Sequence, residues 1–124
     1  MSLRALGNKL FGSGSNITMG EASARVQELI NEHATIVFSK SYCPYCSNTK
    51  KTLKQLNADA FVIELDQDSD GSALQDALED ISGQRTVPNI YINKKHIGGN
   101  SDLQKLDKAG ELEQLLRNAG SLKL

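Results

Sequence analysis

The sequence predicts an α/β fold in which a four-stranded mixed sheet is flanked by helices. Short apolar runs rich in β-branched residues alternate along the chain with segments whose apolar residues recur at helical spacing. The last two predicted strands are short and are joined through Asn93-Lys94, so they form a hairpin of antiparallel strands. A strand-helix-strand unit followed by this hairpin gives a mixed sheet, and 124 residues are enough for one such domain.

The first elements begin with a capping signal. Thr18-x-x-Glu21 is a capping box, and the apolar residues that follow it at helical spacing predict a helix to about His33. Thr35–Phe38 (TIVF) has the continuous apolar character of a strand buried on both faces. From Pro44 onward the pattern is helical, and proline suits the first helical position because an N–H there would have no helical partner.

The second half continues this alternation of strands and helices. The predicted elements are the strand Ala60–Leu65, the helix Ser72–Ile81, the strands Asn89–Ile92 and Lys95–Ile97, and the closing helices Ser101–Leu106 and Glu111–Asn118.

Residues 1–18 are expected to lie outside the domain, which spans residues 19–124. This segment has no acidic residue, contains Arg4 and Lys9, and includes the loop-like run GSGSN. Three leucines in it recur at helical spacing, which is typical of an amphipathic leader for the mitochondrion or another organelle. A flexible extension or a cloning remnant is the alternative, and both interpretations stay open.

Composition excludes several classes of protein. The two cysteines are too close in sequence to close a stabilising loop, unlike those of a disulfide-built secreted scaffold. No apolar run approaches the roughly 20 residues that span a bilayer, and the start lacks the apolar centre of a secretory signal, so we expect a soluble, cytoplasmic protein without a membrane partner. No basic tract is interleaved with aromatic residues, so nucleic acid is not an expected partner.

Charge is separated along the chain although the formal net charge is −1. Residues 33–58 hold four lysines and no acid, whereas residues 59–82 hold eight acids and no lysine or arginine. Such blocks are usually solvated faces. The functional alternative is a positive field around the cysteines that attracts anionic substrates.

Both cysteines lie in the stretch SKSYCPYCS, residues 39–47. Cys43 follows a predicted strand and precedes a predicted helix, so its sulfur is expected to face the free N–H groups and positive dipole end of that helix. Helix N-termini and nearby lysines bring the pKa of a cysteine from about 8.5 into the range ~3.5–7.5, which favours the thiolate that attacks disulfides. Cys46, one turn further along and more enclosed, is expected to remain a thiol and to resolve a mixed disulfide on Cys43.

Other uses of two cysteines fit less well. A zinc site needs four ligands, and His33 and His96 lack the expected spacing, so no metal site is predicted. Pro44 and Tyr45 make a poor apolar interior, which argues against two inert core cysteines. An iron–sulfur cluster held by Cys43 in a dimer, with external thiols completing the iron sites, remains the alternative.

The chain resembles the dithiol glutaredoxins, the CPYC-type class I members of the thioredoxin-like superfamily. Three motifs carry the resemblance in the right order: Lys40-x-x-Cys43-Pro44-Tyr45-Cys46, Arg85-Thr86-Val87-Pro88 and Gly98-Gly99-Asn100-Ser101-Asp102-Leu103. The similarity covers roughly Gly20–Leu122. The lack of tryptophan argues against thioredoxin itself, and Cys46 excludes the monothiol class, which has serine at that position.

The resemblance implies glutathione as co-substrate, with no bound cofactor. Lys40, Gln75 and Arg85 would bind the glycine carboxylate of glutathione, where charge-assisted hydrogen bonds are available. Tyr45 would border the groove for the thiol. The alternative for the charged residues is a solvated surface without a ligand.

The other two motifs would hold the rest of the tripeptide. The backbone of Val87 would pair in β fashion with the cysteine of glutathione, next to a cis Pro88 and supported by Thr86. The Gly98-Gly99 pair would let backbone approach closely. Gly99, Ser101 and Asp102 would hold the γ-glutamyl carboxylate and ammonium, although Asp102 could instead merely cap a helix.

The activity implied is glutathione-dependent thiol-disulfide exchange by a monomer. Cys43 attacks the mixed disulfide between a protein and glutathione, and a second glutathione reduces the resulting Cys43–glutathione disulfide. Cys46 is needed chiefly when the substrate is a protein disulfide. Expected partners are glutathione and glutathionylated or disulfide-containing proteins.

Overall fold

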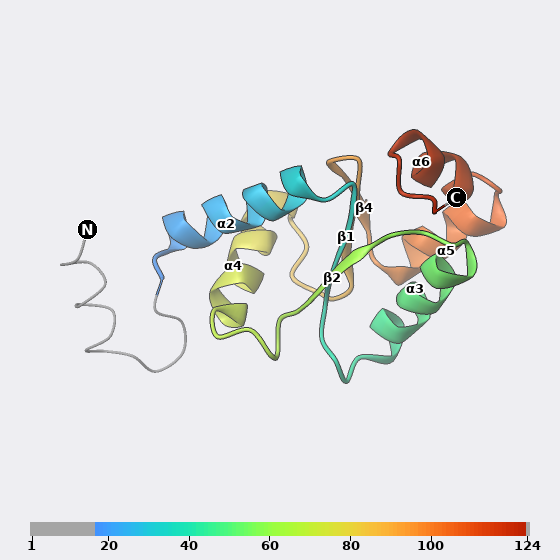
Figure 1. The fold of residues 1–124 in the computed structure, drawn as a ribbon. Helices are drawn as coiled ribbons and strands as arrows, with labels where there is room; N and C mark the ends of the chain where they lie inside the picture. The colour runs from blue at the N-terminus through green and yellow to red at the C-terminus, as the bar shows by residue number, and fades with distance from the viewer. Residues whose placement is uncertain (1–16, 124) are drawn as a thin grey trace.

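Four strands form one mixed sheet in the computed structural model, which describes residues 17–123 (Figure 1). The strands are β1 (Thr35–Ser39), β2 (Phe61–Glu64), β3 (Asn89–Ile92) and β4 (Lys95–Gly98), in the spatial order β2-β1-β3-β4. β1 is parallel to β2 and antiparallel to β3, and β3 is antiparallel to β4. The predicted mixed sheet is confirmed.

Within residues 17–123, five helices cover the two faces of the sheet. They are α2 (Met19–Glu32), α3 (Pro44–Gln55), α4 (Gly71–Ser82), α5 (Asn100–Lys108) and α6 (Leu112–Asn118). Helices α2 and α4 pack together on one face, and α3, α5 and α6 lie on the other, as Figure 1 shows. None of these helices is long and apolar enough to cross a membrane within residues 17–123.

The continuous apolar character of β1 arises because both of its faces are covered. Ile36 and Phe38 pack into the core beneath α2 and α4, whereas Val37 packs into the core beneath α3, α5 and α6. All three side chains are fully buried. On β3, Tyr91 lies in the first core and its neighbours Ile90 and Ile92 lie in the second. Alternate residues of β1 and β3 therefore pack into the two cores on opposite faces of the sheet.

Local signals in the sequence account for several element boundaries. The Thr18 hydroxyl accepts from the Glu21 N–H at 3.1 Å, and the Glu21 carboxylate accepts from the Thr18 N–H at 2.9 Å, so the predicted capping box is present. Asn93 and Lys94 both have positive φ, as a tight hairpin between β3 and β4 requires. The predicted extension lies outside the described residues over positions 1–16.

One glycine is required by a close approach of the chain to itself. A Cβ atom on Gly71 would lie 1.7 Å from the carbonyl oxygen of Leu65, which is backbone and cannot move aside. Gly71 is the first residue of α4, and Leu65 follows β2 directly. The contact therefore fixes where α4 starts relative to the sheet.

The segment after α6 returns to the sheet. The hydroxyl of Ser121 forms a buried 2.6 Å hydrogen bond with that of Thr35 at the start of β1, and the Ser121 carbonyl accepts from the Asp59 N–H at 2.6 Å. The N–H of Lys123 donates to the Asn57 carbonyl at 2.9 Å. These bonds tie the end of the described chain to the turn between α3 and β2.

Candidate active site

The sulfur of Cys43 lies where β1 ends and α3 begins. Cys43 is the N-cap residue of α3, and its sulfur accepts a hydrogen bond from the Cys46 N–H at 3.3 Å. The free N–H groups at a helix start carry partial positive charge, so this position stabilises negative charge on the sulfur. The side chain is half-buried and lies 3.8 Å from the Val87 carbonyl oxygen. The predicted placement of Cys43 is confirmed.

The second cysteine is fully enclosed. Cys46 has no exposed surface, and this burial raises the pKa of its thiol, with a further increase from the neighbouring Cys43 sulfur. The backbone of Lys40 and the hydroxyl of Ser39 act in the opposite direction on that pKa without cancelling the increase. Cys46 is therefore a thiol at neutral pH, as its enclosed position predicts.

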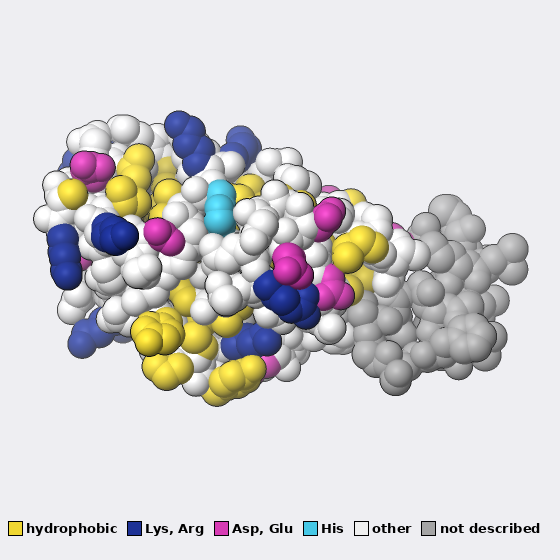
Figure 2. Space-filling view, turned by 180° about the vertical axis from the view of Figure 1, so that it is seen from behind, with side chains coloured by type: hydrophobic (Ala, Val, Ile, Leu, Met, Phe, Trp, Pro, Cys, Tyr) yellow, Lys and Arg dark blue, Asp and Glu magenta, His cyan; other side chains and the backbone are white. Residues whose placement is uncertain are grey.

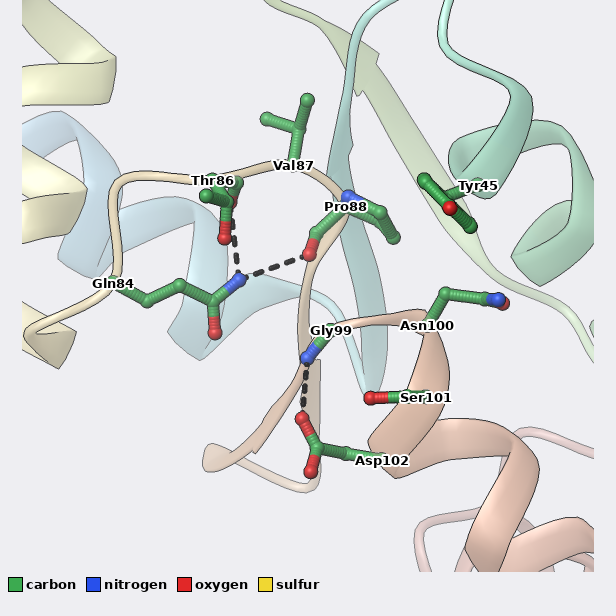
Figure 3. Close-up of a pocket in the computed structure, with 9 residues that line it drawn as sticks. All are labelled: Tyr45, Gln84, Thr86, Val87, Pro88, Gly99, Asn100, Ser101 and Asp102. Atoms are coloured by element: carbon green, nitrogen blue, oxygen red, sulfur yellow. Dashed lines mark hydrogen bonds between the residues drawn. The ribbon is translucent and has the colours of Figure 1, made fainter.

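A pocket of about 600 Å³ lies beside Tyr45 and the loop that precedes β3 (Figure 3). Residues from three regions that are distant in sequence line it: Tyr45, Gln84, Thr86, Val87, Pro88, Gly99, Asn100, Ser101 and Asp102. Seven of them are predicted site residues, and Gln84 and Asn100 are additions. The Val87–Pro88 peptide bond is cis, as the resemblance implies. The roles of these residues in binding glutathione remain predictions.

The three residues predicted to bind the glycine carboxylate do not line this pocket. The guanidinium of Arg85 pairs instead with two acids of α4, at 2.5 Å from Asp76 and 3.3 Å from Glu79. The amide of Gln75 donates to the Arg85 carbonyl at 2.9 Å. Arg85 is still about half exposed, but a ligand carboxylate would have to compete with two acids already in place.

Lys40 belongs to a loop that is anchored from the other side of the site. The carboxylate of Asp66, just beyond β2, accepts from both the N–H of Ser41, at 2.9 Å, and the Ser41 hydroxyl. These bonds lower the pKa of Asp66, and the positive charge of Lys40 lowers it further. The carboxylate thus stays ionised and holds the residues that lead from β1 to Cys43.

The two pocket residues that were not predicted as site residues are both amides. The Asn100 side-chain oxygen accepts from the Gln104 amide at 3.1 Å within α5 and from the Thr49 hydroxyl at 2.9 Å. The bond to Thr49 joins α5 to α3, the helix that begins after Cys43. The Gln84 amide donates to two backbone carbonyls in the loop before β3. No spacing rule marks the bonds that hold them at the site, because Thr49 is far from Asn100 in sequence and the partners of the Gln84 amide are backbone atoms.

The glycine pair before α5 serves the helix start. The Asp102 carboxylate accepts from the Gly99 N–H at 2.9 Å, so Asp102 does cap its own helix. A Cβ atom on Gly98 would lie 2.3 Å from this carboxylate, and Gly98 has φ of +116°. Gly98 is thus required by Asp102 as well as by its own backbone conformation, whereas Gly99 has room for a side chain.

Exposed aromatic side chains surround the cysteine loop. Tyr42 and Tyr45 expose 71% and 67% of their surface, more than any other large hydrophobic residue among those described. Figure 2 shows hydrophobic side chains gathered at the lower edge of the molecule, beside a basic side chain, where the loop between β1 and α3 also lies in Figure 1. Within residues 17–123, no group of three or more His, Cys, Asp or Glu side chains is placed to hold a metal ion.

Comparisons with known proteins agree with this geometry. The family model described as Glutaredoxin matches residues 35–97. A glutaredoxin of Vernicia fordii is 49% identical over 102 residues, which are 82% of this chain and 98% of that protein. Glutaredoxin-C6 of Oryza sativa subsp. japonica is 50% identical over 101 residues, 82% of this chain and 90% of that protein.

A solved structure supports the same assignment. The crystal structure of a buckwheat glutaredoxin–glutathione complex superposes with a TM-score of 0.83, at 45% identity, over 85% of this chain and 96% of that one. The model match, the sequence identity and the fold extend over both cysteines and the loop before β3. The chain therefore belongs to the glutaredoxin family.

Proposed function

We propose that the protein is a glutathione-dependent thiol-disulfide oxidoreductase that reduces mixed disulfides between proteins and glutathione. The observation that carries the proposal is the position of Cys43. Its sulfur receives a backbone N–H at 3.3 Å at the start of α3 and lies 3.8 Å from the carbonyl of Val87, next to a pocket of about 600 Å³. A nucleophilic sulfur and a peptide edge beside it are what exchange with a peptide disulfide requires.

The first half of the reaction releases the protein. The Cys43 thiolate attacks the glutathione sulfur of the mixed disulfide, a bond forms between these two sulfurs, and the protein leaves as a thiolate that takes a proton from water. The N–H of Cys46 and the start of α3 stabilise the negative charge on Cys43 before attack. The buried thiol of Cys46 takes no part in this half.

The second half regenerates the enzyme. The thiolate of a second glutathione attacks the glutathione sulfur of the Cys43–glutathione disulfide, which yields glutathione disulfide and restores the Cys43 thiolate. For a protein disulfide, Cys46 loses its proton and its sulfur attacks Cys43 in the mixed disulfide, so that a Cys43–Cys46 disulfide forms and the substrate leaves as a thiolate. Two molecules of glutathione then reduce the Cys43–Cys46 disulfide and become glutathione disulfide. Because the Cys46 thiol is buried and has a raised pKa, this second route is expected to be slower at neutral pH.

The arrangement around the pocket supports glutathione as the co-substrate. The first intrahelical bond of α5 runs from the Leu103 N–H to the Gly99 carbonyl, so the N–H groups before it, including that of Ser101, are available to an anion such as the γ-glutamyl carboxylate. The glutathione complex of the buckwheat relative supports the same ligand class. Lys40, on the other side of Cys43, would bind the glycine carboxylate.

Turnover of a small glutathione mixed disulfide tests the proposal. Purified protein is mixed with the disulfide, glutathione, glutathione reductase and NADPH, and consumption of NADPH is followed. We expect saturable turnover that requires Cys43. Absence of turnover, with both thiols titratable and the protein folded, would contradict the proposed function. A visible absorption spectrum after anaerobic purification tests the iron–sulfur alternative on the same sample.

A further inference from the structure

A side chain to which the sequence motifs give no role makes two hydrogen bonds to the loop before β3. We propose that Gln84 is a positioning residue for the substrate: its amide fixes the carbonyls of Thr86 and Pro88, so that the peptide groups of Val87 stay open toward Cys43. This inference rests on the proposed function, because the substrate it concerns is a peptide disulfide such as a glutathione mixed disulfide.

The amide of Gln84 uses both of its protons on this loop. Its Nε2 donates to the Thr86 carbonyl at 3.0 Å and to the Pro88 carbonyl at 3.0 Å. Figure 3 shows the side chain reaching across the loop toward these two oxygens. A side-chain amide nitrogen carries two hydrogens, so its donor capacity is filled by these two carbonyls.

The main chain of Gln84 is tied down as well. Its N–H donates to the Ser82 hydroxyl at 3.1 Å, and its carbonyl accepts from the Asn89 amide at 3.2 Å. Ser82 ends α4 and Asn89 begins β3, and both elements belong to the packed body of the protein. The amide is therefore held at a fixed base rather than on a free loop.

Val87 lies between the two carbonyls that Gln84 holds. Its N–H donates to no acceptor in the described part of the chain, and its carbonyl oxygen is 3.8 Å from the Cys43 sulfur. An extended peptide whose sulfur is bonded to Cys43 would find both peptide groups of Val87 available, as in strand addition to a sheet edge. Among the described residues, the Val87 N–H is thus unpaired and the Val87 carbonyl contacts only the Cys43 sulfur, while both neighbouring carbonyls are satisfied.

Loss of the amide would affect recognition more than sulfur chemistry. Without Gln84, the carbonyls of Thr86 and Pro88 would turn toward water in part of the population, and Val87 would turn with them. Apparent affinity falls in proportion to the fraction of molecules that present the binding geometry. The reactivity of Cys43 comes from the start of α3, which Gln84 does not touch.

The test replaces Gln84 with leucine, which keeps the size of the side chain and removes both donors. Gln114→Leu is the matched control, because Gln114 is exposed on α6 and its amide donates to Asn118 there. Each reduced protein reacts with a glutathione mixed disulfide and, separately, with an aromatic disulfide that has no peptide groups. We expect Gln84→Leu to slow the first reaction about tenfold, the value of one to two hydrogen bonds, and to leave the second within about twofold.

The outcomes are distinct. The inference is overturned, and the proposed function left intact, if Gln84→Leu slows both reactions equally or slows neither. Both are overturned if the original protein does not turn over the glutathione mixed disulfide. If the variant fails to fold, amide hydrogen exchange on the unaltered protein decides. Exchange at the Val87 N–H should slow when glutathione is bound, and an unchanged rate there would refute the positioning role.

Discussion

Replacement of Cys46 by serine separates the two routes of thiol exchange. Cys46 contributes two different groups to the site: a buried thiol and a backbone N–H that donates to the Cys43 sulfur at 3.3 Å. Serine removes the first and keeps the second. The environment that stabilises the Cys43 thiolate is therefore retained, and we expect turnover of a glutathione mixed disulfide to stay within about twofold of the original or to rise, because a side reaction that forms the Cys43–Cys46 disulfide is removed.

The size of the expected effects follows from the state of the buried thiol. Burial raises the pKa of the Cys46 thiol above its ordinary value, so this group is a thiol and not a thiolate at pH 7. It contributes little to the one-thiol route at that pH. In the two-thiol route it is indispensable, because a hydroxyl does not displace a thiolate from a disulfide, and we expect at least a loss of about a hundredfold. Burial of the hydroxyl should lower stability by about 1 kcal/mol.

The assay compares three proteins on two substrates. The original, Cys46→Ser and Cys43→Ser proteins are each given a glutathione mixed disulfide and a protein disulfide, with glutathione reductase reporting the first and turbidity or thiol release the second. Cys43→Ser should lose both activities, and Cys46→Ser only the second. The reasoning is refuted if Cys46→Ser is as inactive as Cys43→Ser on the glutathione mixed disulfide while its thermal unfolding is nearly unchanged.

Three further predictions concern charge and backbone. Lys40→Gln combined with Arg85→Gln should weaken glutathione use strongly, and Lys40→Gln should have the larger single effect because two acids already bind Arg85. Steady-state kinetics at two salt concentrations checks this prediction. Unaltered kinetics in the double variant would show that Lys40 and Arg85 do not belong to the glutathione site. Gly71→Ala should lower the free energy of unfolding by about 3 kcal/mol or more, since its Cβ would overlap a backbone carbonyl; denaturation that matches the original would contradict the contact. A hydrogen bond from Arg25 lowers the pKa of Asp68, so the stability it provides is fully present above the ordinary aspartate pKa of about 3.9 and is lost as pH falls through the lower folded pKa. Arg25→Gln should thus destabilise by less than about 1 kcal/mol at pH 6, and the deficit should shrink as the pH is lowered below about 4; a deficit that does not change on acidification would speak against the ion pair.

The elements of this fold are well predicted because their signals are local. The capping box starts α2, Pro44 begins α3, and the apolar run TIVF marks β1, each from residues that are neighbours in the chain. One deviation occurs at a helix start where the determining contact is distant. The helix predicted over Ser72–Ile81 starts one residue earlier, at Gly71, where the chain passes close to the Leu65 carbonyl. No residue next to Gly71 in the sequence indicates this contact.

The candidate site is predicted unevenly for a similar reason. The motifs locate Cys43, Cys46 and the loop of Val87 and Pro88, because these residues share short spacings. Arg85 is read from the sequence as a cation available to a ligand, whereas α4 brings two of the many acids of residues 59–82 against it. The acidic residues are visible in the sequence, but which of their side chains face Arg85 depends on how α4 packs. The amide of Gln84 bonds to backbone carbonyls and Asn100 bonds to the distant Thr49, and no sequence pattern indicates these contacts.

The register between β1 and β3 has a practical consequence for where a label or linker can be attached to this protein. Phe38 pairs with Asn89, and from that pair the chain runs five residues to Cys43 on one strand and two residues back to Val87 on the other. The distance from the Cys43 sulfur to the Val87 peptide groups is thus set by the pairing of β1 with β3 and by the start of α3, and not by α6. Helix α6 lies at the far end of the molecule from the cysteine loop in Figure 1. A fluorescent reporter or an electrode linker attached to α6 should therefore leave this distance unchanged. A single residue inserted between Phe38 and Cys43 would instead move the reacting sulfur away from the peptide groups of Val87 that bind the substrate.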